Sequence, residues 1–141
     1  MGLFRSGKTA PKKPLRIFIV EDSKVYASQL EFMLQSKFGE SVVVSTFPVA
    51  EVMEVKLEHN DIPDLIIMDH FLNARYDDAE DGSDVLQRIK KDYPKIRLVL
   101  HTSASDADTA RQAIAGEICH FVPKGTDAFD KLAEIVAALN A

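Results

Sequence analysis

The chain has 141 residues, of which 46% are hydrophobic and 28% are charged, and its net charge is −5. This length is that of one ordinary domain, and the low glycine and proline content excludes collagen-like and low-complexity chains. The chain has 17 basic and 22 acidic residues, so a broad basic surface that binds nucleic acid is not expected. The single cysteine, Cys119, excludes an internal disulfide framework. No apolar run approaches the roughly 20 residues of a membrane span, so we expect a cytoplasmic protein with no membrane contact.

Residues 1–14 differ from the rest of the chain. They carry four of the 17 basic residues, no acidic residue and two prolines, and they lack hydrophobic periodicity. We predict a flexible basic tail there and one domain over 15–141. The tail contains GLFRSGKT (2–9), which has the spacing of a phosphate-binding loop. Such loops follow a strand and open a helix, and this one has neither neighbour, so we expect no nucleotide site.

Short apolar or β-branched runs alternate with segments of helical periodicity from residue 15 onward. The runs that predict strands are 15–20, 41–47, 64–69, 96–102 and 118–122. The helices are expected over about 24–38, 49–58, 84–92 and 106–115, and from about 127 to the end. Ser23 and Thr126 are the predicted N-caps, and Gly39 is a predicted helix end. Five strands alternating with five helices predict a three-layer α/β domain, a (βα)5 unit with a five-stranded parallel sheet.

A long polar stretch over 70–82 interrupts this alternation. Its acidic residues partly match a calcium loop around Asp81. However, Ala79 occupies a ligand position, and Arg88 stands where a bidentate glutamate is needed. We therefore predict a solvated acidic loop rather than a calcium site, and a basic partner is one molecule that it could dock.

Polar residues stand where the predicted strands end, and a parallel α/β sheet binds its ligands beyond those ends. They are Glu21 and Asp22 after the first strand, Asp69 after the third, Thr102 and Ser103 after the fourth, and Lys124 after the fifth. Clustered carboxylates need a compensating cation to stay ionised, and Mg²⁺ takes carboxylate, water and phosphate oxygens. A carboxylate can also attack phosphorus, and an ammonium or a hydroxyl can stabilise the transferred oxygens.

Four pieces of the chain, IFIVEDS, PDLIIMD, LVLHTSAS and FVPKG, stand in this order at the predicted strand ends. Together they resemble the receiver domain of bacterial two-component response regulators, the family of the chemotaxis response regulator. The resemblance spans residues 15–140 and implies a flavodoxin-like receiver fold. It also implies a magnesium site built by Glu21, Asp22, Asp69 and the backbone carbonyl of Phe71, with Asp22 as the more direct ligand.

The same resemblance assigns roles in phosphoryl transfer. Asp69 matches the phosphoacceptor, and Lys124 matches the lysine that pairs with the phosphoryl group. Thr102 matches the switch hydroxyl and Phe121 the switch aromatic residue. Ser103 stays an alternative for the hydroxyl, because Ser103-Ala104 also resembles the common Thr-Ala pair of the family.

The chain departs from the family pattern in three places. Gly125 follows Lys124 where the family usually has proline. The loop after Asp69 is several residues longer than usual, which puts the metal environment and the dephosphorylation rate in question. His101 replaces an apolar residue that commonly precedes the switch hydroxyl.

The resemblance implies a single-domain response regulator. A sensor histidine kinase or phosphotransfer protein would pass a phosphoryl group to Asp69 with Mg²⁺, and the changed surface would signal to an unknown downstream protein or continue a phosphorelay. Such a protein catalyses only its own phosphorylation and dephosphorylation. Asn140 and Ala141 alone follow the last predicted helix, so we expect no DNA-binding domain.

Two other functions stay open at this point. One is a degenerate receiver that binds proteins independently of phosphorylation. The other is a hydrolase or mutase with an aspartyl nucleophile, although such enzymes usually carry a second acid where Phe71 stands.

Overall fold

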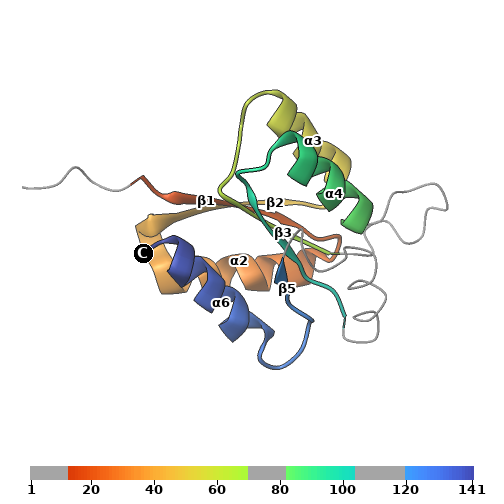
Figure 1. Ribbon diagram of the computed structural model, residues 1–141. Helices are drawn as coiled ribbons and strands as arrows, with labels where there is room; N and C mark the ends of the chain where they lie inside the picture. The colour runs from red at the N-terminus through yellow and green to blue at the C-terminus, as the bar shows by residue number, and fades with distance from the viewer. Residues whose placement is uncertain (1–12, 70–81, 104–119) are drawn as a thin grey trace, which may run out of the picture.

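Five parallel strands form one sheet in the order β2–β1–β3–β4–β5, as a computed structural model of the chain shows (Figure 1). The strands are β1 (Leu15–Val20), β2 (Val42–Phe47), β3 (Leu65–Met68), β4 (Arg97–Leu100) and β5 (His120–Phe121). The helices are α2 (Lys24–Phe38), α3 (Ala50–Glu58), α4 (Gly82–Asp92) and α6 (Ala128–Leu139), with a 3-10 turn η1 (Gly39–Ser41) after α2. The fold is the predicted three-layer α/β fold with a flavodoxin-like strand order.

The structure describes residues 13–69, 82–103 and 120–141. The predictions of a flexible tail, of the acidic loop, of a helix over 106–115 and of strand residues 118–119 therefore lie, wholly or almost wholly, outside the described residues. The backbone carbonyl of Phe71, a predicted metal ligand, lies outside them too. Within the described ranges, no helix is both long and apolar enough to cross a membrane.

The strand order places a topological switch point between β1 and β3. β1 pairs with β2 on one side, with Leu15 opposite Val42, and with β3 on the other, with Ile17 opposite Leu65. The chain therefore leaves β1 in one direction along the sheet and continues from β3 in the other. Ligand sites of such sheets lie outside the carboxyl ends of the strands at this point.

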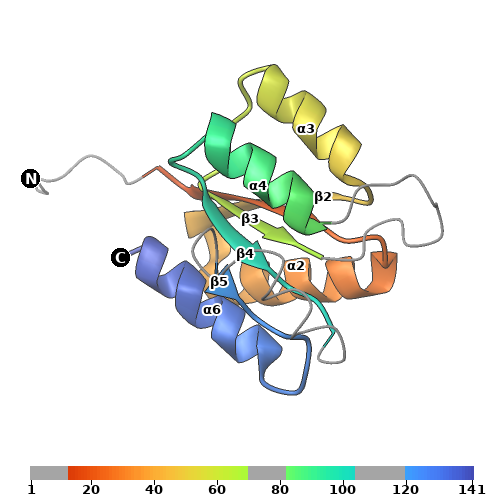
Figure 2. The ribbon, with the colours of Figure 1, turned by 45° about the vertical axis from the view of Figure 1, so that its right-hand side comes forward.

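The two faces of the sheet are buried against different helices (Figures 1 and 2). Phe18 and Val20 of β1 face the layer of α3 and α4. Ile17 and Ile19 face the layer of α2 and α6. Successive side chains of a strand point to opposite faces, so a strand buried on both faces has no polar position. This is why the central strands β1 and β3 read LRIFIV and LIIM, in which Arg16 is the one polar residue.

The ends of α2 are as the sequence predicts. The Ser23 hydroxyl accepts a hydrogen bond from the Tyr26 amide at 3.2 Å, which makes Ser23 the N-cap. Gly39 follows the last turn with φ 55° and ψ −130°, and its amide donates to the Gln35 carbonyl. A positive φ at a helix end favours glycine.

The predicted N-cap of α6 is wrong by one residue. The residue at this position is Asp127 and not Thr126, and the Asp127 side chain makes no capping hydrogen bond. The Ala128 amide, which a Thr126 cap would bind, donates instead to the Gly125 carbonyl at 3.2 Å. A backbone turn thus satisfies the group that the side chain was expected to satisfy.

We expect Gly39→Ala to lower the free energy of unfolding by about 1–2 kcal/mol, because an L side chain is strained at this positive φ. A Cβ at Gly39 would meet no atom within 4 Å, so steric clash does not contribute. Gly125→Ala is the matched control, because it also has open space but no positive φ. We expect the control to be neutral or slightly stabilising. Urea unfolding of both variants measures the difference, and equal effects would contradict this interpretation of Gly39.

Candidate functional site

Three carboxylates meet just beyond the carboxyl ends of β1 and β3. The sheet hydrogen bonds continue one residue past each strand, since the Glu21 amide donates to Phe47 and the Asp69 amide donates to Val20. Carboxylate oxygens of Glu21, Asp22 and Asp69 consequently lie within 4.8 Å of one another. Glu21 and Asp69 are buried, with exposed fractions of 5% and 8%, whereas Asp22 is exposed.

Lys124 supplies a positive charge to this cluster. It lies beyond β5, and its amide donates to the Thr102 carbonyl at 2.6 Å, so the backbone holds it beside β4. Its Nζ lies 2.7 Å from Glu21 Oε1 and 3.5 Å from Asp69 Oδ2. One ammonium does not balance three carboxylates, and the remaining negative charge favours a divalent cation.

The three carboxylates have different surroundings. Glu21 accepts hydrogen bonds on both oxygens, from Lys124 and from the Ser23 amide at 3.1 Å. Burial raises the pKa of Glu21, and the charge of Asp69 raises it further, while the hydrogen bond from Lys124 lowers it. Glu21 is thus already occupied by protein groups, and the exposed Asp22 faces solvent with Asp69 close by. Hard carboxylate oxygens in this arrangement suit Mg²⁺ bound together with water.

The two predicted hydroxyls lie at the end of β4. Thr102 is 1% exposed, and Ser103 is half-buried and forms an isolated bridge with Lys124. Leu100 pairs with Phe121 in the sheet, and Phe121 packs against the α3–α4 layer. An extended chain places Thr102 on the same face as Leu100. Thr102 and Phe121 therefore share one face of the sheet, and Ser103 follows on the other.

Two residues that the sequence did not place at the site border it directly. The Tyr26 hydroxyl on α2 lies 2.5 Å from His101 Nε2. His101 Nδ1 lies 2.7 Å from the Val122 carbonyl. The Lys124 ammonium lies over the Tyr26 ring, 4.4 Å from its centroid. The signal in the sequence is the alternation of β4, which makes His101 an inward-facing residue on the face of Val99.

The hydrogen-bond partners and the burial of His101 together favour one neutral tautomer of its imidazole. A carbonyl only accepts, so Nδ1 donates to Val122, and Nε2 then accepts from the Tyr26 hydroxyl. Burial lowers the pKa of His101, and the charge of Lys124 lowers it too, while the hydrogen bond to Val122 and the charge of Asp69 partly offset this effect. Burial raises the pKa of Tyr26 to about 12. Both shifts favour the neutral imidazole and the protonated phenol.

We expect the protein to lose stability as the pH falls below the ordinary histidine pKa of about 6.5. The unfolded chain binds a proton on His101 at higher pH than the folded chain does. The free energy of unfolding therefore decreases as the pH decreases through this window. Glu21 contributes to the pH dependence of stability with the opposite sign, because its raised pKa stabilises the folded state at lower pH.

The difference between wild type and His101→Gln isolates the histidine, because both proteins keep Glu21. Urea unfolding between pH 5.5 and pH 7.5 is expected to give a smaller pH slope for His101→Gln. The same slope in both proteins would contradict a buried neutral His101.

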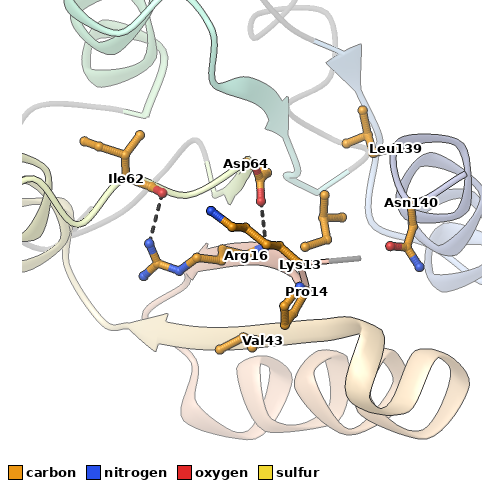
Figure 3. Close-up of a pocket in the computed structure, with 9 residues that line it drawn as sticks. Lys13, Pro14, Arg16, Val43, Ile62, Asp64, Leu139 and Asn140 are labelled. Atoms are coloured by element: carbon orange, nitrogen blue, oxygen red, sulfur yellow. Dashed lines mark hydrogen bonds between the residues drawn. The ribbon is translucent and has the colours of Figure 1, made fainter. Parts of the chain in front are cut away.

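A hollow of about 410 Å³ lies at the opposite end of the sheet (Figure 3). Arg16, at the start of β1, donates through its amide to Asp64 at 2.8 Å and through its guanidinium to the Ile62 carbonyl at 3.0 Å. The guanidinium also pairs with Asp61. The charges of this hollow thus hold the amino ends of β1 and β3 together, and the three carboxylates and Lys124 lie at the other end of the sheet.

Comparison with known protein families matches residues 17–137 to the response regulator receiver domain. The chain belongs to this family. Receiver domains are phosphoacceptor domains of two-component signalling, and the predicted family resemblance is confirmed over most of the chain. A comparison with curated protein sequences gives no match.

Solved receiver domains share the fold. The N-terminal receiver domain of a response regulator from Bacteroides fragilis is 25% identical, with a TM-score of 0.72 over 91% of this chain and 98% of that one. The receiver domain of an HD domain-containing protein from Pseudomonas fluorescens Pf-5 is 24% identical, with a TM-score of 0.73 over 95% and 93%. The BeF3-activated receiver domain of DrrB is 20% identical, with a TM-score of 0.70 over 91% and 99%.

Proposed function

We propose that Asp69 accepts the phosphoryl group from a phosphohistidine on a sensor histidine kinase or phosphotransfer protein. One observation carries the proposal: the Asp69 carboxylate lies 3.5 Å from the Lys124 ammonium and within 4.8 Å of the carboxylate oxygens of Glu21 and Asp22. A nucleophile, a cation for the transferred oxygens and an acidic pair for a metal are the parts that phosphoryl transfer needs.

Glu21, Asp22, Asp69 and the backbone carbonyl of Phe71 are the proposed magnesium ligands. Asp22 is the more direct ligand, because it is exposed while Glu21 is engaged by Lys124 and Ser23. When bound, the ion would neutralise charge on the transferred phosphoryl oxygens. The nucleophile and the second positive charge for phosphoryl transfer would come from the side chains of Asp69 and Lys124.

In the proposed reaction, an oxygen of Asp69 attacks the phosphorus atom of the phosphohistidine. The new oxygen–phosphorus bond forms, the phosphorus–nitrogen bond breaks, and the donor imidazole leaves and takes up a proton. Lys124 then exchanges its contact with Asp69 for the phosphoryl oxygens, which carry more negative charge. Water attack on the same phosphorus reverses the modification and releases phosphate.

Thr102 and Phe121 are the proposed switch residues, with Ser103 as the alternative hydroxyl. Thr102 would turn toward the new phosphoryl oxygens, and Phe121, which shares its face of the sheet and is only partly buried, would follow. A local charge thus biases a two-state surface. The output is contact with a downstream protein or onward transfer in a phosphorelay.

The test uses the purified chain with acetyl phosphate and Mg²⁺, followed by intact mass and peptide mapping. We expect a gain of one phosphate on the peptide that contains Asp69, and no gain when a chelator removes Mg²⁺. If neither phosphorylation nor binding of Mg²⁺ and beryllofluoride is observed, the chain acts instead as a phosphorylation-independent binding module. Turnover of a phosphorylated small molecule would point to a hydrolase or mutase.

A further inference from the structure

Lys124 has a long, flexible side chain, and its position determines how the site works. A lysine has many rotamers, and ordering it has an entropic cost. The carboxylates of Glu21 and Asp69 attract the ammonium through two ion pairs. The Tyr26 ring provides a further contact, because Nζ lies 4.4 Å from its centroid. This distance is within the range in which a ring face attracts a cation.

The Tyr26 ring is itself held by two other parts of the fold. Its hydroxyl donates to His101 at the end of β4, and its ring contacts the Phe129 ring of α6 in an edge arrangement, with centroids 5.6 Å apart. A side chain of α2 is thus fixed against β4 and α6 at once. The ring has little freedom to leave the ammonium.

His101 connects this arrangement to the backbone of β5. Its imidazole bridges the Tyr26 hydroxyl and the Val122 carbonyl, and Val122 lies two residues before Lys124. The segment that carries the lysine therefore also holds, through the Val122 carbonyl, the imidazole that anchors the ring. The apolar residue that usually precedes the switch hydroxyl could not make this bridge.

We propose that Tyr26, anchored by His101, is a positioning residue that holds the Lys124 ammonium at the acidic cluster. The proposal rests on the proposed function, since it concerns the lysine that would contact the phosphoryl group. Tyr26 acts through Lys124. It stabilises the place of the ammonium before the phosphoryl group arrives.

The functional test is a double-mutant cycle on the rate of phosphorylation by acetyl phosphate with Mg²⁺. We expect Tyr26→Leu to lower the rate about 2- to 30-fold, the range that a cation–π contact corresponds to. Tyr26→Phe keeps the ring and loses the hydroxyl, so its rate should lie between those of Tyr26→Leu and wild type. In a Lys124→Ala background, Tyr26→Leu should have no further effect.

Tyr93→Leu is the matched control for loss of a partly buried tyrosine, because Tyr93 packs against the α3–α4 layer. It should leave the rate unchanged. A Tyr26→Leu effect of the same size with and without Lys124 would show a general structural role and overturn the proposal. An unchanged rate for Tyr26→Leu would also overturn it.

A second measurement does not depend on phosphorylation. Protons above an aromatic ring are shifted upfield, so the ε-methylene signals of Lys124 should be shifted upfield in wild type and Tyr26→Phe but not in Tyr26→Leu. If the wild type neither becomes phosphorylated nor binds Mg²⁺ and beryllofluoride, the proposed function fails and this NMR result alone decides the placement of Lys124. Absence of the shift in the wild type would overturn the inference, and its loss only in Tyr26→Leu would support it.

Discussion

Asp69→Asn is expected to abolish phosphorylation by acetyl phosphate. The amide has nearly the shape of the carboxylate but lacks the anionic oxygen that attacks phosphorus. The substitution also removes one of three neighbouring negative charges, and so relieves the repulsion that, after burial, contributes to the raised pKa of Glu21. We therefore expect the variant to be folded and no less stable than wild type. Intact mass after incubation with acetyl phosphate and Mg²⁺ measures the phosphate gain.

Asp130→Asn is the matched control for this experiment. Asp130 is an exposed acid in the first turn of α6, so the substitution removes the same charge away from the cluster. It should become phosphorylated like wild type. A phosphate gain that persists in Asp69→Asn would place the acceptor elsewhere in the chain.

Lys124→Ala is expected to slow phosphorylation by roughly 10²- to 10³-fold, the usual effect of removing one group that stabilises transition-state charge. The same variant should bind Mg²⁺ more tightly, by roughly tenfold, because a positive charge near the carboxylates is lost. The unfolding free energy should fall by about 1–3 kcal/mol without Mg²⁺, since Glu21 loses a charged hydrogen-bond partner in a buried position. Slower chemistry together with tighter metal binding distinguishes this prediction from general damage to the site.

Lys131→Ala is the control for Lys124→Ala. Lys131 pairs with Asp127 on the surface of α6, where the two side chains are 50% and 63% exposed. Such pairs contribute little to stability, so the variant should match wild type in phosphorylation rate, metal binding and stability. Equal phosphorylation rates in Lys124→Ala and wild type would show that the ammonium does not contact the phosphoryl group.

The fold class follows from the sequence because strands buried on both faces must be apolar throughout. LRIFIV over 15–20 is apolar except for Arg16 near its start, and LIIM before Asp69 is apolar throughout, so a sheet with helices on both faces is predicted from them. Local capping was predicted with mixed success. The Ser23 hydroxyl binds the Tyr26 amide as predicted, whereas the Gly125 carbonyl binds the Ala128 amide that Thr126 was expected to bind.

The candidate site was predictable as a set of residues, because parallel strands bring their carboxyl ends to one edge. Glu21, Asp69 and Lys124 are each recognisable from their place after an apolar run. The different roles of Glu21 and Asp22 were implied by the family resemblance, but periodicity and strand direction do not distinguish the two residues. Glu21 and Asp22 are neighbours in the chain, and only the packing around them buries one carboxylate against Lys124 and leaves the other exposed.

The layers of this protein and the polar residues at one edge of its sheet are thus predictable from the chain alone, because both depend on local periodicity and strand direction. Only the tertiary structure shows that the Tyr26 hydroxyl contacts His101, 75 residues further along the chain, and that the Lys124 ammonium lies against the tyrosine ring. Periodicity predicts the elements that carry or precede these side chains. It does not predict their contacts, because these depend on how α2, β4 and β5 pack together.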